Sequence, residues 1–211
     1  MSQANFLKTN FLAMLFLLAS WIITWTTNLA FCEIPKPQYY GIYLVDNGKL
    51  MELKPEDLSM ADTPDDSIRK STIKGIEELP RLIITDPNGY IIFYNEKISY
   101  DEVHLNRLEY MKEGAVRFQL ESDWGNYILL PIREAMCEVN MWVGGEDIEL
   151  KVGPIKGEKN MYRLEPAVPL SDGPYAVHFG ELQTNSEIED TEFIYGFVVN
   201  SSGDKSLATI I

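Results

Sequence analysis

Apart from carboxylates, few residues in this sequence could perform acid–base, nucleophilic or metal chemistry. The chain has 211 residues, with two histidines, His104 and His178, and two cysteines, Cys32 and Cys137. Its 32 aspartate and glutamate residues make neighbouring carboxylates common by chance. It contains no nucleophile elbow, phosphate-binding loop, zinc-protease motif or paired-cysteine spacing. The sequence therefore predicts no catalytic residue and no cofactor, and we expect a protein that is not an enzyme.

The charge of the chain disfavours some classes of partner. The 32 acidic residues outnumber 18 lysines and arginines, which gives a net charge of −14. Nucleic-acid binding needs a basic stripe, and none occurs, so we expect no nucleic-acid partner. Calcium suits carboxylate-rich loops outside the cell, but the acidic stretches 61–67 and 187–192 lack the alternating spacing of an EF-hand loop. We therefore expect solvated loops there and no bound metal.

The first 32 residues have the composition of an export signal. Lys8 is the only charged residue before Glu33, and the stretch FLAMLFLLASWIIT forms a continuous, mostly apolar run. This order is typical of a secretory signal peptide. Ala30 and Cys32 are small residues that signal peptidase accepts three residues and one residue before a cut. Simple cleavage before Glu33 is one of three interpretations.

Two other interpretations keep the segment at the membrane. The sequence Leu29-Ala30-Phe31-Cys32 resembles the lipobox of bacterial lipoproteins at Leu, Ala and Cys, with Phe31 where that motif has a small residue, and the resemblance implies lipidation of Cys32. Alternatively, residues 11–31 are long enough for a helix that spans a bilayer. In all three interpretations residues 33–211 lie outside the cytoplasm, in the periplasm, at the cell surface or secreted. Membrane contact is then confined to residues 11–31 or to a lipid on Cys32.

The region from residue 33 to residue 113 predicts two β-hairpins. The stretches YGIYLVDNGKLMEL (40–53) and LIITDPNGYIIFY (82–94) each place Asn-Gly between two apolar runs. Asn-Gly favours the type I′ turn, which needs positive φ at both central residues. Residues 54–80 are polar and are expected to form a long crossing loop with one short helix. Residues 99–112 fit either a helical turn or a strand.

The region 114–211 predicts an antiparallel β-sandwich. Val116, Phe118 and Leu120 alternate with polar residues, and Trp124-Gly125-Asn126 is a turn leading into the apolar run YILLP. Further strands are expected at 137–143, 147–152, 160–165, 174–180 and 192–199. Seven short strands separated by turn residues are typical of a sandwich. We therefore predict three parts: a signal peptide or anchor (1–32), a hairpin-rich β region (33–113) and a β-sandwich (114–211).

One short motif links this sandwich to a known fold. LSDGPYAVHFG, residues 170–180, resembles the tyrosine-corner segment of immunoglobulin-like domains. The resemblance implies that the hydroxyl group of Tyr175 bonds back to the backbone of the corner. Val177 stands where antibody domains have a cysteine, so the chain is more similar to bacterial and fibronectin-type modules. This resemblance covers residues 114–200 and concerns the fold, not the function.

A second resemblance gives an alternative function. LIITDPNGYIIFYN is similar to the opening hairpin of PAS sensor domains, in which short helices that flank a ligand pocket would follow Asn95. The chain instead continues into many strands, with little helical character. The alternative is a membrane-anchored extracytoplasmic sensory domain that acts through a partner.

Alternation along two strands predicts where single residues point. Cys137 shares a strand face with Val139, Met141 and Val143, so we expect a buried, inert thiol. His178 points away from Tyr175 and Val177, and we expect it to be exposed to solvent. Trp142 and Asn140 lie opposite Cys137. They form either an exposed platform for a glycan or a partner protein, or part of the contact with the N-terminal region.

The sequence thus predicts an exported, mostly β protein with an immunoglobulin-like sandwich. Its expected role is non-catalytic binding of a protein or another component of the cell envelope. The candidate binding residues are Trp142 and Asn140, and Cys32 is the candidate lipidation site.

Overall fold

The computed structural model describes residues 35–61, 67–69, 72–120, 131–180 and 193–203. The signal segment 1–32, with Cys32, and the turn at 124–126 lie outside these residues. The residues from Pro35 onward belong to one compact unit. No helix among the described residues is long and apolar enough to cross a membrane.

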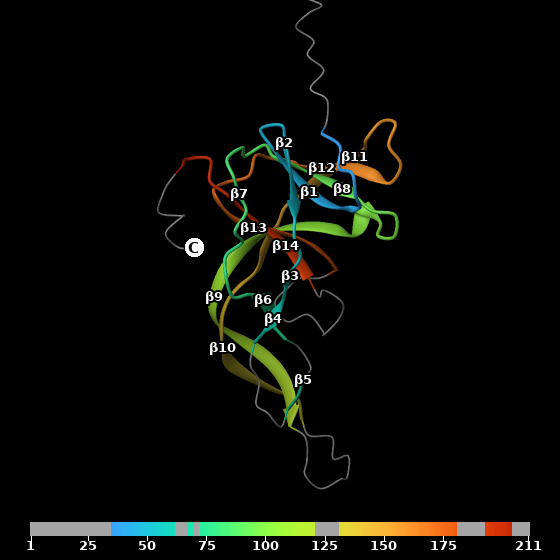
Figure 1. The fold of residues 1–211 in the computed structure, drawn as a ribbon. Helices are drawn as coiled ribbons and strands as arrows, with labels where there is room; N and C mark the ends of the chain where they lie inside the picture. Colours follow the sequence, from blue (N-terminus) through green and yellow to red (C-terminus); the bar gives the residue numbers. More distant parts are fainter. Residues whose placement is uncertain (1–34, 62–66, 70–71, 121–130, 181–192, 204–211) are drawn as a thin grey trace, which may run out of the picture. The chain divides into compact units, whose positions relative to one another are not determined.

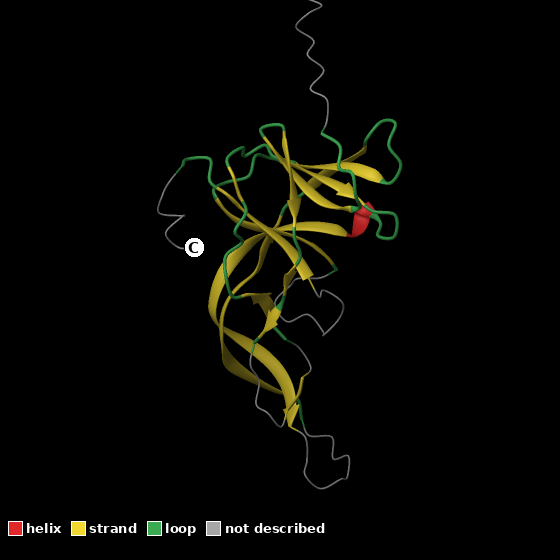
Figure 2. Ribbon diagram, in the orientation of Figure 1, coloured by secondary structure: helices red, strands yellow, loops and turns green. Residues whose placement is uncertain are grey.

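The described residues are mostly β and form two sheets (Figures 1 and 2). All strand pairs between them are antiparallel except β7 with β14, and η1 (Tyr100–Glu102) is their one helical turn. Sheet A has the order β11-β12-β8-β1-β2. Its strands are β11 (Leu150–Pro154), β12 (Met161–Pro166), β8 (Tyr90–Tyr94), β1 (Gly41–Asp46) and β2 (Lys49–Leu53).

Sheet B has the order β3-β14-β13-β9-β10-β6-β4, with β5 beside β9 and β7 beside β14. Its long strands are β9 (Val103–Leu120), β10 (Arg133–Asp147), β13 (Gly173–Phe179) and β14 (Phe193–Val199). Its short strands are β3 (Glu56–Asp57), β4 (Ser59–Met60), β5 (Ser67–Arg69), β6 (Lys74–Ile76) and β7 (Ile83–Ile84). The predicted strands from 137 onward are therefore present as β10 to β14, whereas the predicted run YILLP at 127–131 lies almost wholly outside the described residues. The ambiguous residues 99–112 form η1 and the first half of β9.

The first predicted hairpin is confirmed. β1 and β2 pair through a two-residue turn, and Asp46 lies opposite Lys49. Asn47 and Gly48 both have positive φ, 49° and 78°. This is the combination that a type I′ turn needs, and it matches the twist of the two strands.

The second predicted hairpin is wrong. β7 pairs with β14 in sheet B, whereas β8 lies between β1 and β12 in sheet A. The Gly89 N–H donates to the Asp86 carbonyl at 3.0 Å, and neither Asn88 nor Gly89 has positive φ. Asp-Pro-Asn-Gly suits a type I turn, which splays the flanking strands instead of pairing them. The turn therefore carries the chain from one sheet to the other.

Strands from both predicted regions contribute to both sheets. β9 runs through the expected boundary between residues 113 and 114, and sheet A joins β1, β2 and β8 to β11 and β12. The expected crossing loop at 54–80 instead contains four short strands of sheet B, β3 to β6, and its described residues include no helix. Alternation identified the longer strands, but it missed the short strands in residues 54–80 and did not identify which strands pair.

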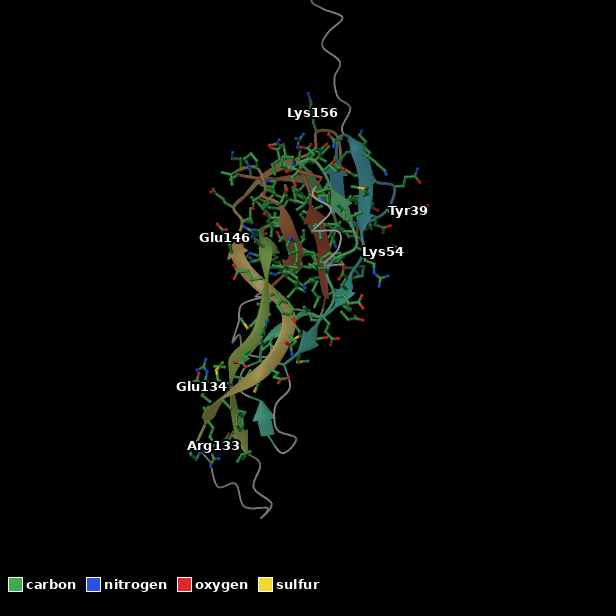
Figure 3. All side chains as sticks on the ribbon, turned by 90° about the vertical axis from the view of Figure 1, so that its left-hand side faces the viewer. Tyr39, Lys54, Arg133, Glu134, Glu146 and Lys156 are labelled. Atoms are coloured by element: carbon green, nitrogen blue, oxygen red, sulfur yellow. The ribbon has the colours of Figure 1, made fainter. Side chains whose placement is uncertain are left out.

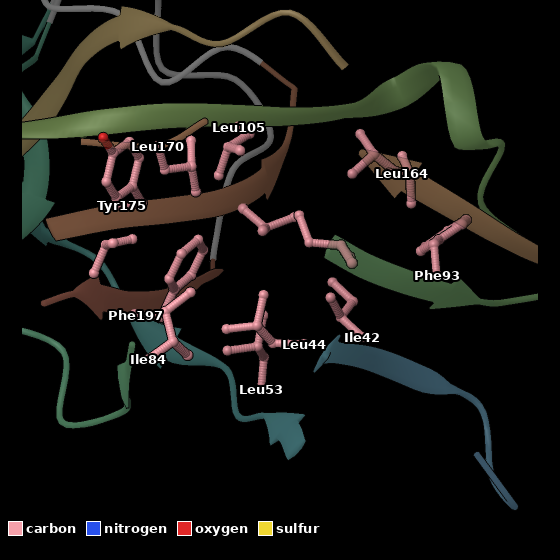
Figure 4. Close-up of a cluster of buried hydrophobic side chains, with 14 residues drawn as sticks. Ile42, Leu44, Leu53, Ile84, Phe93, Leu105, Leu164, Leu170, Tyr175 and Phe197 are labelled. Carbon is pink, nitrogen blue, oxygen red and sulfur yellow. The ribbon is translucent and has the colours of Figure 1, made fainter. Parts of the chain in front are cut away.

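The main core lies between the two sheets (Figure 4). Sheet A contributes Ile42, Leu44 and Phe93, and sheet B contributes Leu105 and Phe197, all nearly inaccessible to solvent. Burial of such apolar side chains is the dominant favourable term in folding. The sheets are therefore held together by a continuous apolar layer.

Sheet B curls until it is nearly closed and barrel-like. Its edge strands β3 and β4 are separated in sequence by Leu58 alone. A second apolar cluster, formed by Ile76, Leu108, Ala176 and Ile194, fills the inner side of the curl. The described part of β13 is thus buried on both of its faces, with Tyr175 facing sheet A and Ala176 facing this cluster.

The predicted tyrosine-corner bond is present. The hydroxyl of Tyr175 donates to the backbone carbonyl of Ser171 at 3.0 Å and lies 3.1 Å from the Ser171 hydroxyl. The Tyr175 ring is 1% exposed and stacks on Phe197. The bond joins the start of β13 to the preceding loop and satisfies the one polar group that the buried ring carries.

Replacement of this hydroxyl tests its contribution to stability. Tyr175→Phe removes a part-buried hydrogen bond whose acceptor residue, Ser171, is exposed to solvent, so we expect a loss of about 0.5–1.5 kcal/mol in the free energy of unfolding. Urea unfolding followed by circular dichroism measures it. Tyr110→Phe, on a ring that is 47% exposed, is the control and is expected to change little. Equal effects of the two changes would contradict a specific role for the corner.

Candidate functional site

A pocket of about 510 Å³ lies where sheet A meets the edge of sheet B. One wall is the end of β2 and the residues that follow it, Glu52 to Glu56, and the other wall is the segment from Glu78 to Leu82. Gly196 of β14 lies between them. We call this pocket the β2 groove.

The floor of the β2 groove is apolar and tightly built. Leu53 is buried, and Leu79 and Leu82 are half-buried. Gly196 has no side chain, and a methyl group there would overlap the Pro80 ring and approach the Glu56 carboxylate to 3.2 Å. The glycine therefore allows the 78–82 segment to lie directly on β14.

The rim of the groove is charged, with an excess of carboxylates. Glu52, Glu56 and Glu78 outnumber Lys54 and Arg81 among its lining residues, and Figure 3 shows Lys54 at the surface. Arg81 pairs with Glu78 at 3.1 Å, but both side chains are at least 80% exposed, so the pair contributes little stability.

Glu56 is the carboxylate closest to the floor. Burial raises the pKa of its carboxyl above the ordinary value, the positive charge of Arg81 opposes this shift, and Glu78 adds to it. A half-buried carboxylate is stabilised by any additional cation that approaches it. An apolar floor with a few polar groups above it is the usual composition of a binding site. The groove can therefore hold a ligand that combines an apolar group with a positive charge.

The sequence did not point to the groove. Its walls come from two segments about 25 residues apart, and its floor includes a glycine from β14. The ELKPE run at 52–56 is ordinary for the end of an exposed strand. Only the pairing of β14 with β3 and β7 brings these segments together.

The expectation that His178 is exposed is wrong. Its side chain is 2% exposed, because the second face of β13 lies inside the curl of sheet B. Its Nε2 lies 2.6 Å from Oδ1 of Asn106, and the Asn106 amide donates to the Gly145 carbonyl at 3.1 Å. His104 stacks on His178 with ring centroids 5.5 Å apart.

These contacts define the protonation state of His178. Since the Asn106 amide nitrogen is engaged as a donor, its oxygen accepts the Nε2–H of a neutral imidazole. Burial and then the neighbouring His104 lower the pKa of His178 to about 4, and the backbone of Gly180 only partly opposes this shift. Nδ1 is buried and has no hydrogen-bond partner among the described residues. The imidazole is thus enclosed, and its described contacts are with other residues of the protein and not with a site that a substrate could occupy.

The predicted platform residues lie at an irregularity of β10. The register with β9 shifts between Glu138 and Met141, and Asn140, which is exposed, has a φ of 46°. Trp142 is half-buried, packs against the second cluster and lies 5.3 Å from the ring of Tyr110. The structure thus places the two residues on one strand, neither of them lines the β2 groove, and their role as a binding platform stays a prediction.

Cys137 packs with Val139 and Met141 on the face that alternation predicted, but it is half-buried and not buried as expected. Its Sγ lies 3.8 Å from the Ala135 carbonyl. Within the described ranges no group of three or more His, Cys, Asp or Glu residues could hold a metal ion. Neither finding adds a second candidate site.

Comparisons with known proteins give no relative: no family model, no curated protein and no solved structure matches this chain.

The buried His178 predicts a pH dependence of stability. Its folded-state pKa of about 4 lies below the ordinary value of 6.5, so the unfolded chain binds more protons between these values. The neutral imidazole contributes its full share to the free energy of unfolding above about pH 6.5. This contribution is lost as the pH falls to about 4, and the loss is at most roughly 3 kcal/mol.

His178→Gln tests this prediction, because glutamine keeps a donor for Asn106 and does not titrate. We expect urea unfolding to show a smaller loss of stability for this variant between pH 7 and pH 4.5 than for the wild type. His104→Gln is the control, since its ring is less buried, and should keep most of the wild-type pH dependence. The same pH dependence in His178→Gln and in the wild type would attribute the loss to carboxylates alone.

Proposed function

We propose that this chain is an exported, non-catalytic module that binds a protein or another component of the cell envelope through the β2 groove. The groove itself is the observation that carries the proposal. Its volume lies within the usual range of ligand pockets, and it combines an apolar floor with a few charged groups on its rim. The enclosed His178 offers no comparable opening.

The scaffold in this proposal is an immunoglobulin-like sandwich. Two packed sheets and the Tyr175–Ser171 bond support it. The long β9–β10 hairpin and the curl of sheet B are additions to the simple sandwich that alternation alone suggested. The fold and the function are separate parts of the proposal, because a fold does not specify a function.

Export is supported by the order of residues at the N-terminus: one positive charge, an apolar run and small residues before Glu33. We expect the protein purified from its own cells to begin at Glu33, measured by intact mass and N-terminal sequencing. A mass that includes residues 1–32 would contradict cleavage and favour the anchored sensory domain. A lipid-sized addition on Cys32 would instead establish a lipoprotein.

Photo-crosslinking tests binding through the groove. Glu78 is exposed on the rim, so a benzoylphenylalanine in its place should cross-link a partner in the native cell envelope. Lys151 is exposed on β11, at the other edge of sheet A, and provides the matched control position. We expect a discrete adduct from position 78 and none from position 151. No adduct from position 78, or equal adducts from both positions, would contradict the proposal.

A further inference from the structure

We infer that the β2 groove takes an extended segment of a partner protein, which adds to sheet A as a new strand beside β2 and carries lysine or arginine toward the carboxylates of the rim. This inference rests on the proposed function and specifies the chemistry of the partner.

The free edge of β2 is the first support. In a two-residue hairpin, the pair that flanks the turn exchanges both backbone hydrogen bonds, and such pairs alternate along the strands. Asp46 and Lys49 flank the turn, so Met51 and Leu53 also bond to β1. The N–H and C=O groups of Leu50 and Glu52 therefore point away from β1.

β2 is the last strand of sheet A, so these outward groups have no strand beside them. Leu50 and Glu52 also make no backbone hydrogen bond to a loop among the described residues. A row of unpaired N–H and C=O groups is a template for another strand. Such an edge provides affinity through the main chain, while neighbouring pockets provide specificity.

The position of the groove is the second support. Its first wall is Glu52 to Lys54, the same end of β2 that presents outward backbone groups. A strand added there has side chains that alternate between its two faces. Those on one face meet Leu79 and Leu82, across the groove. The edge and the apolar floor thus fit one occupant, an extended chain with apolar residues at alternate positions.

Charge is the third support and selects the partner. The three carboxylates on the rim outnumber its two cations, Lys54 and Arg81, and Arg81 is already paired with Glu78. The protein carries a net charge of −14, so its field attracts basic segments and repels acidic ones. We therefore assign lysine or arginine to the positions between the apolar residues of the added strand.

The other edge of sheet A offers a contrast within the same molecule. β11 ends in Pro154, which has no N–H to donate, and its one charged residue is Lys151. β2 has no proline, and it carries Glu52 as well as Lys49. A proline discourages strand addition, and a lysine with no carboxylate on the same strand repels a basic segment. Binding of a basic strand should therefore occur at β2 and not at β11.

Two capped pentapeptides test the inference, Lys-Val-Lys-Val-Lys and Glu-Val-Glu-Val-Glu. Added to the 15N-labelled protein, the lysine peptide should shift the amide resonances of Leu50, Glu52 and Lys54 and leave that of Lys151 in place. The glutamate peptide should shift none of them. Equal binding of both peptides, shifts at β11 instead of β2, or no shift at millimolar concentration would each overturn the inference.

Two matched variants of Glu52 distinguish the contribution of its backbone N–H to peptide binding from that of its side chain. Glu52→Pro removes an outward N–H that β1 does not use, and we expect at least about tenfold weaker binding of the lysine peptide, the equivalent of one or two hydrogen bonds. Glu52→Gln keeps the N–H and removes one rim charge, so we expect a change of about two- to fivefold. A peptide with N-methylated valines should lose affinity as Glu52→Pro does, and this measurement applies even if the proline variant does not fold.

The two proposals fail separately. A cross-linked partner at position 78 without peptide shifts at β2 would overturn strand addition and leave the β2 groove as a binding site of another kind. No adduct at position 78 would overturn the proposed function, and strand addition, which rests on it, would fall with it.

Discussion

Burial of β13 on both faces is the constraint on which the described fold depends. Tyr175 and Val177 contact sheet A, whereas Ala176 and His178 point into the curl of sheet B. Each face needs its own cover. Sheet A covers one, and the other is closed by short strands from residues 56–76 together with the β9–β10 hairpin (Figure 1). Sheet B must therefore bend until its edges nearly meet, and sheet A can pack against only part of it.

A polar pair inside the curl follows from the same constraint. An imidazole without a partner would be costly to bury, and the bond from His178 to Asn106 offsets part of that cost. Asn106 in turn bonds to the Gly145 carbonyl, where the β10 register shifts a second time. These contacts link β13, β9 and β10 at one point. His178, which could have performed acid–base chemistry, thus has a structural role, and its low pKa is a consequence of its burial.

The proposed binding surface, the β2 groove, lies where one sheet ends and the other continues. Sheet A ends at β2, while sheet B continues past β14 to β3 and β7. The unequal ends leave an open strand edge beside an apolar hollow, and Gly196 allows the hollow to reach β14. The acidic composition of the chain sets the charge around it. An open edge and a complementary charge together favour a basic, extended partner over an anionic one.

The sequence by itself determined the features that depend on neighbouring residues: the Asn47-Gly48 turn, the alternation of the later strands and the Tyr175 corner. Each involves atoms within a few residues of one another. Tertiary structure alone decided which strands pair, that Asp86–Gly89 connects two sheets, that His178 is enclosed and that the β2 groove exists. Alternation shows that one face of a strand is buried, but not which distant strand covers it, and it cannot show a strand such as β13 whose second face is covered as well.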